Sequence, residues 1–126
     1  MEKNVKWFII LLVSTLLLIS CFDTSSQREI DNYRLFATKN MWTFIELDTV
    51  TGKMWQIQFD VQGDNRGGVV LNEQDLLDGR RKIPGRFTLY ETQNMYNFIL
   101  HDQIDGMTWQ VQWSIESENR GIIRIY

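Results

Sequence analysis

An internal repeat constrains this chain more than any other feature. Residues 35–71 align with residues 89–125 at a constant offset of 54, without a gap, and 14 of the 37 pairs are identical. Self-similarity at a fixed spacing indicates a protein built from two copies of one structural unit. The fold of the chain must therefore be explained by one unit and by the way in which its two copies pack.

Each repeat predicts β-strands separated by turns. Trp, Phe, Ile, Val and Thr gather in short runs bounded by Gly, Asp and Asn, and no segment from residue 33 onward keeps a helical period. We expect strands at 33–37, 42–48, 53–61 and 68–71 in the first repeat, and at 86–91, 96–102, 107–115 and 121–126 in the second.

The clearest turn is 48–53, where Asp48 can cap the turn and Gly52 can adopt a positive φ; residues 102–106 repeat it. A four-residue loop pairs Asp48 with Lys53 and Phe44 with Ile57, and it sorts apolar side chains onto one face of each hairpin. The predicted apolar faces are Trp42, Phe44, Trp55, Ile57 and Phe59 in the first repeat, and Tyr96, Phe98, Leu100, Trp109, Val111 and Trp113 in the second.

Two units that are each apolar on one face bury themselves most simply against one another. The sequence therefore predicts an all-β fold, a small eight-stranded antiparallel sandwich or barrel with pseudo-two-fold symmetry. It forms a single domain over 33–126, built from repeats 33–71 and 87–125 and joined through 72–85. Glu46 falls on the predicted apolar face, where the second repeat has Leu100. It either reaches the rim of that face, pairs with a cation or lies in a pocket, and we expect it at the rim.

The segment before the repeats is organised like a secretory signal. Lys3 and Lys6 precede an almost wholly apolar run at 7–19, which as a helix would rise only about 20 Å and would not span a bilayer core of about 30 Å. The run ends in Leu18-Ile19-Ser20-Cys21, which resembles the lipobox of bacterial lipoproteins.

This resemblance implies that residues 1–20 are a lipoprotein signal peptide and that Cys21, the only cysteine, carries acyl chains such as palmitate. Residues 21–32 would then be a lipidated tether, and the protein would be anchored in a membrane of the cell envelope. Phe22 after the cysteine favours the outer membrane if the cell has one.

A second resemblance lies in the first hairpin. The pattern formed by Leu47, Asp48, Thr49, Thr51, Gly52 and Trp55 is similar to a motif of small uncharacterised bacterial extracytoplasmic β-repeat proteins. It covers only the hairpin, and the second repeat departs from it at His101, Gln103 and Asp105. The resemblance implies a fold element and no activity.

Charge and residue types exclude several functions. Without residues 1–20 the chain has 11 Lys and Arg against 15 Asp and Glu, which argues against nucleic-acid binding. His101 is the only histidine, so no multi-histidine metal site forms, and we predict no cofactor. We expect His101 on the polar face of its strand, and turn capping rather than calcium binding by Asp48 and Asp102.

The residues with most binding potential are amides and arginines that recur in both repeats. Gln56, Gln58, Gln110, Gln112 and Asn97 form a predicted polar surface for a glycan or an extended peptide. Arg66 and Arg120, in repeated Asn-Arg-Gly turns, are either symmetry-related anion-binding groups or structural residues that hold carbonyls or Asp48 and Asp102 across the sheet; the structural alternative is favoured.

These features together predict a small envelope lipoprotein that acts as a non-catalytic binding or accessory module for a protein or glycan partner. The alternatives are an inhibitor or immunity-like lipoprotein that caps a specific protein, and a small envelope hydrolase. A hydrolase would need carboxylates or His101 to converge in a cleft.

Overall fold

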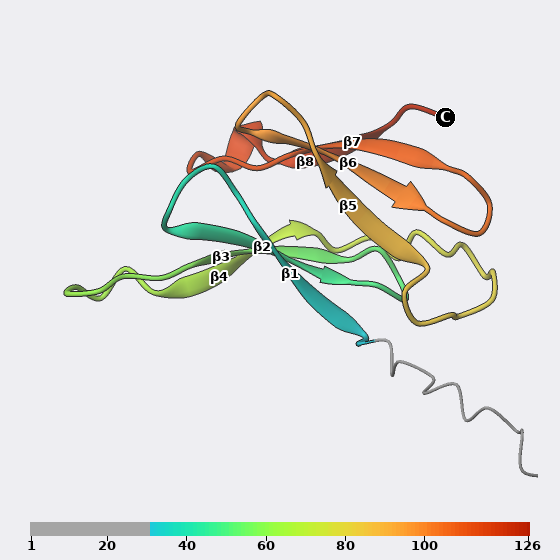
Figure 1. Ribbon diagram of the computed structural model, residues 1–126, viewed down its shortest axis with the longest axis horizontal. Helices are drawn as coiled ribbons and strands as arrows, with labels where there is room; N and C mark the ends of the chain where they lie inside the picture. The colour runs from blue at the N-terminus through green and yellow to red at the C-terminus, as the bar shows by residue number, and fades with distance from the viewer. Residues whose placement is uncertain (1–30) are drawn as a thin grey trace, which may run out of the picture.

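Two four-stranded antiparallel sheets pack face to face in the computed structural model, which describes residues 31–126 (Figure 1). Cys21, the predicted signal peptide and most of the predicted tether lie outside the described residues. Sheet 1 contains β1 (Tyr33–Ala37), β2 (Thr43–Asp48), β3 (Met54–Gln58) and β4 (Gly67–Asn72), and sheet 2 contains β5 (Phe87–Glu91), β6 (Asn97–Asp102), β7 (Thr108–Gln112) and β8 (Gly121–Arg124).

Each sheet is one repeat, and in each the strands pair in the order in which they follow in the sequence. The predicted all-β fold is confirmed, and the two separate sheets make it a sandwich. A short 3-10 turn, η2 (Ser117–Asn119), precedes β8. None of the described residues forms a helix long and apolar enough to cross a membrane.

The predicted hairpin register is also confirmed. Phe44 lies opposite Ile57, and the Asp48 N–H donates to the Lys53 carbonyl at 2.9 Å, so the loop has four residues. Gly52 adopts a φ of +79°, which explains the glycine at this position. The second hairpin repeats this arrangement between Asp102 and Met107.

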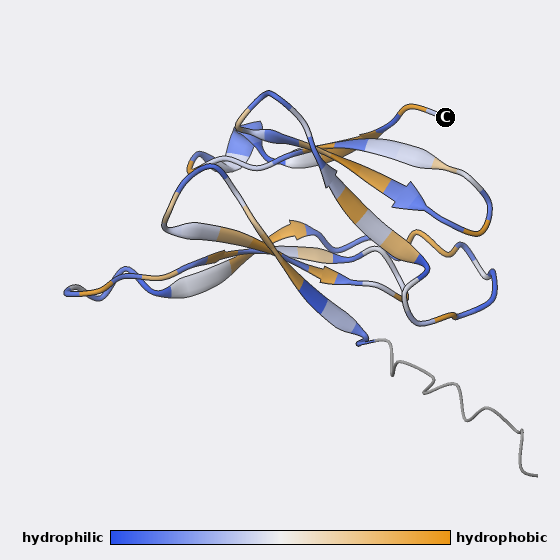
Figure 2. Ribbon diagram, viewed as in Figure 1, coloured by the Kyte–Doolittle hydropathy of each residue, from blue (hydrophilic) through white to orange (hydrophobic). Residues whose placement is uncertain are grey.

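The two units bury opposite faces, which corrects the prediction for the first one. In β6, Phe98 and Leu100 point into the core as expected, but in β2 the buried residues are Ile45 and Leu47. The predicted apolar face of the first unit, with Phe44, is the outer face of sheet 1. Figure 2 shows hydrophobic segments in the strands of both layers.

The predicted pseudo-two-fold relation between the units is therefore wrong. A two-fold axis between the sheets would bury aligned residues in both units, yet Phe98 is buried where Phe44 is not, and Ile45 is buried where Ile99 is only partly so. The second unit instead stacks on the first in the same orientation. The face of the second unit that is equivalent to the outer face of the first unit therefore packs against the inner face of the first unit.

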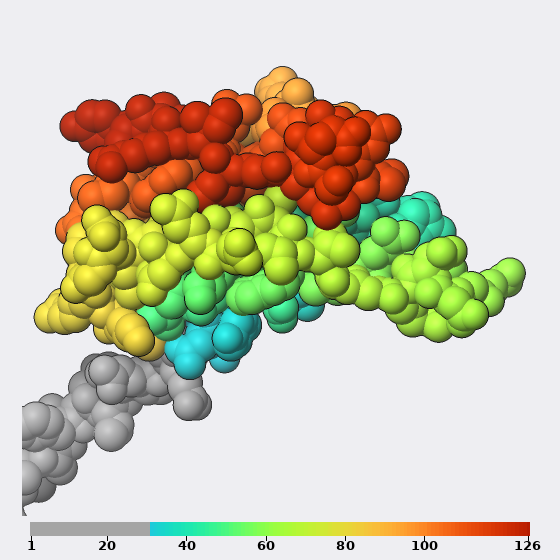
Figure 3. All heavy atoms as spheres, turned by 180° about the vertical axis from the view of Figure 1, so that it is seen from behind, coloured from blue at the N-terminus to red at the C-terminus, as the bar shows by residue number. Residues whose placement is uncertain are grey.

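The core lies between the two sheets and is closed at one end by the connector between β4 and β5, residues 73–86. It contains Ile45, Leu47, Met54, Leu71, Leu76, Leu77, Phe87, Leu89, Phe98, Leu100, Trp109, Val111 and Trp113. Thr49 links the first hairpin to the start of the second unit, because its hydroxyl accepts the Gly85 N–H and its carbonyl accepts the Phe87 N–H, both at 2.9 Å. Figure 3 shows the second unit lying along the first, with the β3–β4 loop projecting beyond it.

Candidate functional site

The outer face of sheet 1 carries a surface of large apolar side chains. We call it the aromatic face, and it consists of Tyr33, Leu35, Trp42, Phe44, Trp55, Ile57 and Phe59. Leu35 is 61% exposed, Tyr33 55% and Phe59 40%. A contiguous exposed apolar surface on a small domain indicates an interaction site.

The rings of the aromatic face contact one another, which gives the surface a defined shape. The Trp42 and Phe59 ring centroids lie 5.3 Å apart, and those of Tyr33 and Trp55 lie 6.3 Å apart. Glu46 lies opposite both Leu35 and Trp55 in the register. The prediction that it occupies a rim is wrong, because this carboxylate lies half-buried in the middle of the face.

The glutamines and arginines singled out in the sequence line two repeat-equivalent clefts. One of about 230 Å³ contains Gln56, Gln58 and Arg66, and the other, of about 350 Å³, contains Gln110, Gln112 and Arg120. The clefts do not form one polar surface. Gln56 is buried between the sheets, where its side-chain oxygen accepts the Ser114 N–H at 3.3 Å, whereas Gln110 is exposed on the outer face of sheet 2.

Both arginines have the structural role, and of its two forms they take the one in which the arginine holds carbonyls and not Asp48 or Asp102. Arg66 Nε donates to the Asp60 carbonyl at 3.1 Å, and Arg120 Nε donates to the equivalent Ser114 carbonyl at 2.8 Å. Asn97, the remaining predicted binding residue, is half-buried, and its amide donates to the Val111 carbonyl at 3.4 Å. These contacts leave the exposed Gln58 and Gln110 as the freest amides of the two clefts, while Gln112 is half-buried.

His101 lies on the outer face of sheet 2, opposite Thr108, as its alternation predicts. Its ring centroid is 6.3 Å from that of Tyr90. Its Nδ1 is buried and has no hydrogen-bond partner among the described residues. Within residues 31–126 there is no group of three His, Asp or Glu side chains placed to hold a metal ion.

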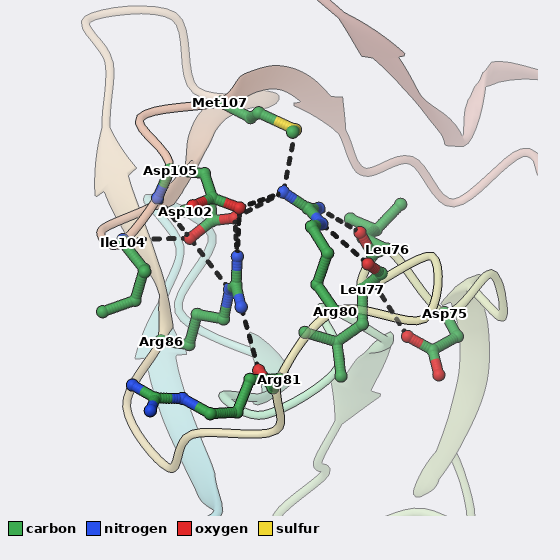
Figure 4. Close-up of polar contacts among 10 residues, drawn as sticks. All are labelled: Asp75, Leu76, Leu77, Arg80, Arg81, Arg86, Asp102, Ile104, Asp105 and Met107. Carbon is green, nitrogen blue, oxygen red and sulfur yellow. Dashed lines mark hydrogen bonds and ion pairs between the residues drawn. The ribbon is translucent and has the colours of Figure 1, made fainter.

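The strongest electrostatic feature is an ionic cluster at the β6–β7 turn, which the sequence did not predict. Arg86 binds the Asp102 carboxylate with both Nε and Nη2, at 3.0 and 2.9 Å (Figure 4). The side chains of these two residues are only 2% and 0% exposed. Arg80 and Asp105 complete the cluster, since each arginine donates to Asp105 at 2.6 Å.

The cluster fixes Asp102 as a carboxylate. Burial alone would raise the pKa of Asp102, but hydrogen bonds from Arg86 and from the backbone N–H groups of Ile104 and Asp105 outweigh it and lower that pKa below its ordinary value. The same hydrogen bond raises the pKa of Arg86. Asp102 is therefore ionised, and the charge of Arg86 compensates its negative charge. This arrangement suits a structural ion pair and not a general acid or a free nucleophile.

The equivalent residue of the first unit, Asp48, has only the capping role. Its carboxylate accepts the Val50 and Thr51 N–H groups, at 2.9 and 3.3 Å, and the Thr51 hydroxyl at 2.7 Å. Turn capping by Asp48 and Asp102, as predicted, is confirmed. The ionic pairing of Asp102 is an addition of the second unit, made with arginines of the connector.

Acid is expected to weaken the fold through Asp102. The pKa of its carboxyl is lower in the folded chain than in the unfolded one, so the ionised group stabilises the fold at pH values above its unfolded pKa of about 4. This stabilisation is lost as the pH falls through the pKa of the folded chain. We expect the urea midpoint to fall as the pH is lowered from about 5 to about 3, and to fall less steeply in Asp102→Asn. Equally steep profiles in the two proteins would contradict this assignment.

A cavity of about 500 Å³ lies beside the ionic cluster, between the connector and β7–β8. Its lining is mixed, with Asp75, Asp78 and Arg124 next to Trp109.

Comparison of the chain with known protein families, with curated proteins and with solved structures finds no match.

Proposed function

We propose that this protein is a non-catalytic binding module of the cell envelope, held to a membrane through lipid on Cys21, and that it docks a partner protein on the aromatic face of sheet 1. The observation that carries the proposal is the exposure of this face. Its equivalent in the second unit is core, where Phe87, Leu89 and Phe98 are at most 5% exposed. A surface with the composition of a core is typical of an interface.

The chemistry of the face favours a protein over a glycan. Aromatic and aliphatic side chains form nearly all of it, and Glu46 is the charged group at its centre. Sugar hydroxyls need several hydrogen-bonding partners, and the aromatic face supplies few. A protein partner would instead bury apolar area, which is the main source of binding free energy in interfaces of this kind.

Leu35→Lys is expected to abolish partner binding. Leu35 lies on the edge strand of sheet 1 with 61% of its surface exposed, so the substitution places a charge in the aromatic face without disturbing the core. We expect tagged residues 22–126 to recover a stoichiometric partner from an envelope extract, and the variant to recover at least tenfold less, measured by quantitative mass spectrometry.

The matched control is Val61→Lys. Val61 is 68% exposed but lies in the β3–β4 loop, outside the aromatic face. This variant should recover the partner at the level of the unsubstituted protein. Equal recovery by Leu35→Lys and by the unsubstituted protein would show that the partner, if one is captured, binds elsewhere.

A further inference from the structure

The repeat shows what kind of surface fits the aromatic face. In the sandwich, the same face of the second unit packs against the inner face of sheet 1. Stacking in the same sense leaves two faces free in each molecule. One is the aromatic face of sheet 1, and the other is the outer face of sheet 2, which carries Ile99, His101, Thr108, Gln110 and Ile123.

Each free face duplicates a face that is already paired inside the molecule. Tyr33, Leu35 and Phe44 correspond to the buried Phe87, Leu89 and Phe98. The outer face of sheet 2 in turn corresponds to the inner face of sheet 1, and both keep an isoleucine and a glutamine at equivalent places, Ile99 for Ile45 and Gln110 for Gln56. The internal interface is thus a template for contact between two copies.

The two faces depart from this template in a complementary way. Leu47 and Leu100 are both fully buried in the shared core of the sandwich. Their equivalents on the free faces are His101 on sheet 2 and Glu46 on sheet 1. Two apolar residues of the core are therefore replaced by an imidazole on one free face and a carboxylate on the other. An imidazole N–H can donate a hydrogen bond to a carboxylate, so the two groups are complementary.

We propose that the protein assembles head to tail, with the aromatic face of one copy on the outer face of sheet 2 of the next. The proposal rests on the proposed function, since it names the partner of the aromatic face as a second copy. Such a contact joins two different surfaces, so it leaves one of each kind free and continues as an open stack. Polar residues such as Thr108, where the internal interface has Met54, make this contact weaker than the internal one.

Cysteine crosslinking in the full chain tests the orientation. Glu46→Cys and His101→Cys each place a thiol at the centre of one free face. Two differently tagged full-length chains, one with each substitution, are produced in the same cells, and the membranes are treated with a short bismaleimide. We expect a crosslinked dimer that carries both tags, and a ladder of higher species when one chain carries both substitutions.

The controls separate the alternatives. Cys21 is present in every chain, so the unsubstituted protein reports any crosslink through it, and Val61→Cys reports random collision. A dimer formed as strongly by Glu46→Cys alone would mean that two aromatic faces meet, and it would overturn the proposal, as would the absence of any dimer above these controls. Ile123→Lys in the His101→Cys chain should remove the mixed dimer.

The same variant distinguishes this inference from the proposed function. If the partner is a second copy, association is lost when every copy carries Leu35→Lys or when every copy carries Ile123→Lys, because each substitution then blocks one side of every contact. If Leu35→Lys loses a captured protein while Ile123→Lys retains it and no mixed dimer forms, the aromatic face binds a different protein and only the head-to-tail assembly is wrong. If neither variant changes capture and no dimer forms, both proposals fail.

Discussion

Arg86→Met is expected to lower the free energy of unfolding by about 3–5 kcal/mol. The substitution keeps most of the side-chain volume but leaves the buried Asp102 carboxylate without its two-pronged partner, at a position where water does not replace it. Arg80 still reaches Asp102 at 3.2 Å, but through one nitrogen. Urea unfolding followed by tryptophan fluorescence measures the change.

Arg66→Met is the matched control. Arg66 is exposed and binds only a carbonyl of its own turn, so its loss is expected to cost less than about 1 kcal/mol. In the double variant Arg86→Met with Asp102→Leu, the unpaired charge is gone, and we expect a smaller loss than in Arg86→Met alone. An Arg86→Met protein as stable as the control variant would show that the ion pair is not what holds the turn.

The second large effect comes from one substitution made at two aligned positions. Leu89→Ala is expected to cost about 2–5 kcal/mol, because this side chain is 5% exposed and its truncation leaves a cavity in the core. Leu35→Ala, at the equivalent place in the first unit, is expected to cost at most about 0.5 kcal/mol, because Leu35 is 61% exposed. A lower urea midpoint for Leu89→Ala than for Leu35→Ala would show that this face is buried in the second unit and exposed in the first.

The comparison is decisive because the two residues are identical in type and equivalent in the repeat. Equal costs would mean that both units bury the same face, as a two-fold arrangement requires, and would contradict the stacking described above. The measurement is best made at low protein concentration, where association through the aromatic face adds nothing to the apparent stability of either variant.

The pairing within each unit could be predicted from the sequence, since register follows from side-chain alternation. A slip of one residue would have mixed Phe44 with Gln56, and only the four-residue loop kept the apolar residues together. The Asp and Gly of the turn indicated the same loop. Local sequence signals and the pattern of the strands agreed, and the structure confirms their result.

The choice of the buried face could not be predicted from the apolar content of a single unit. The aromatic face of sheet 1 is the richer in apolar surface, yet it lies outside, and the face with Thr43 and Gln56 lies inside. A signal was present in the positions where the repeats diverge in polarity. Glu46 against Leu100, and Leu47 against His101, each place the ionisable residue on the face that is free in its own unit.

The ionic cluster could not be predicted from the sequence, for a different reason. Arg80 and Arg86 belong to the connector, and their carboxylate partners lie 16 to 25 residues further along the chain. No spacing rule connects a connector arginine with a hairpin turn. The repeat did contain a partial signal, since Asp105 replaces Thr51 and so adds a carboxylate to the second turn only.

The strand order has a consequence for the speed of folding. In both sheets every strand pairs only with the strands next to it in the sequence. The loop that closes when two strands pair is therefore short. Each sheet can form one hairpin at a time before the two sheets pack together. Many sandwiches must first bring together strands from distant parts of the chain, which is the slow step of their folding. Here that step is reduced to the docking of two preformed sheets across one connector.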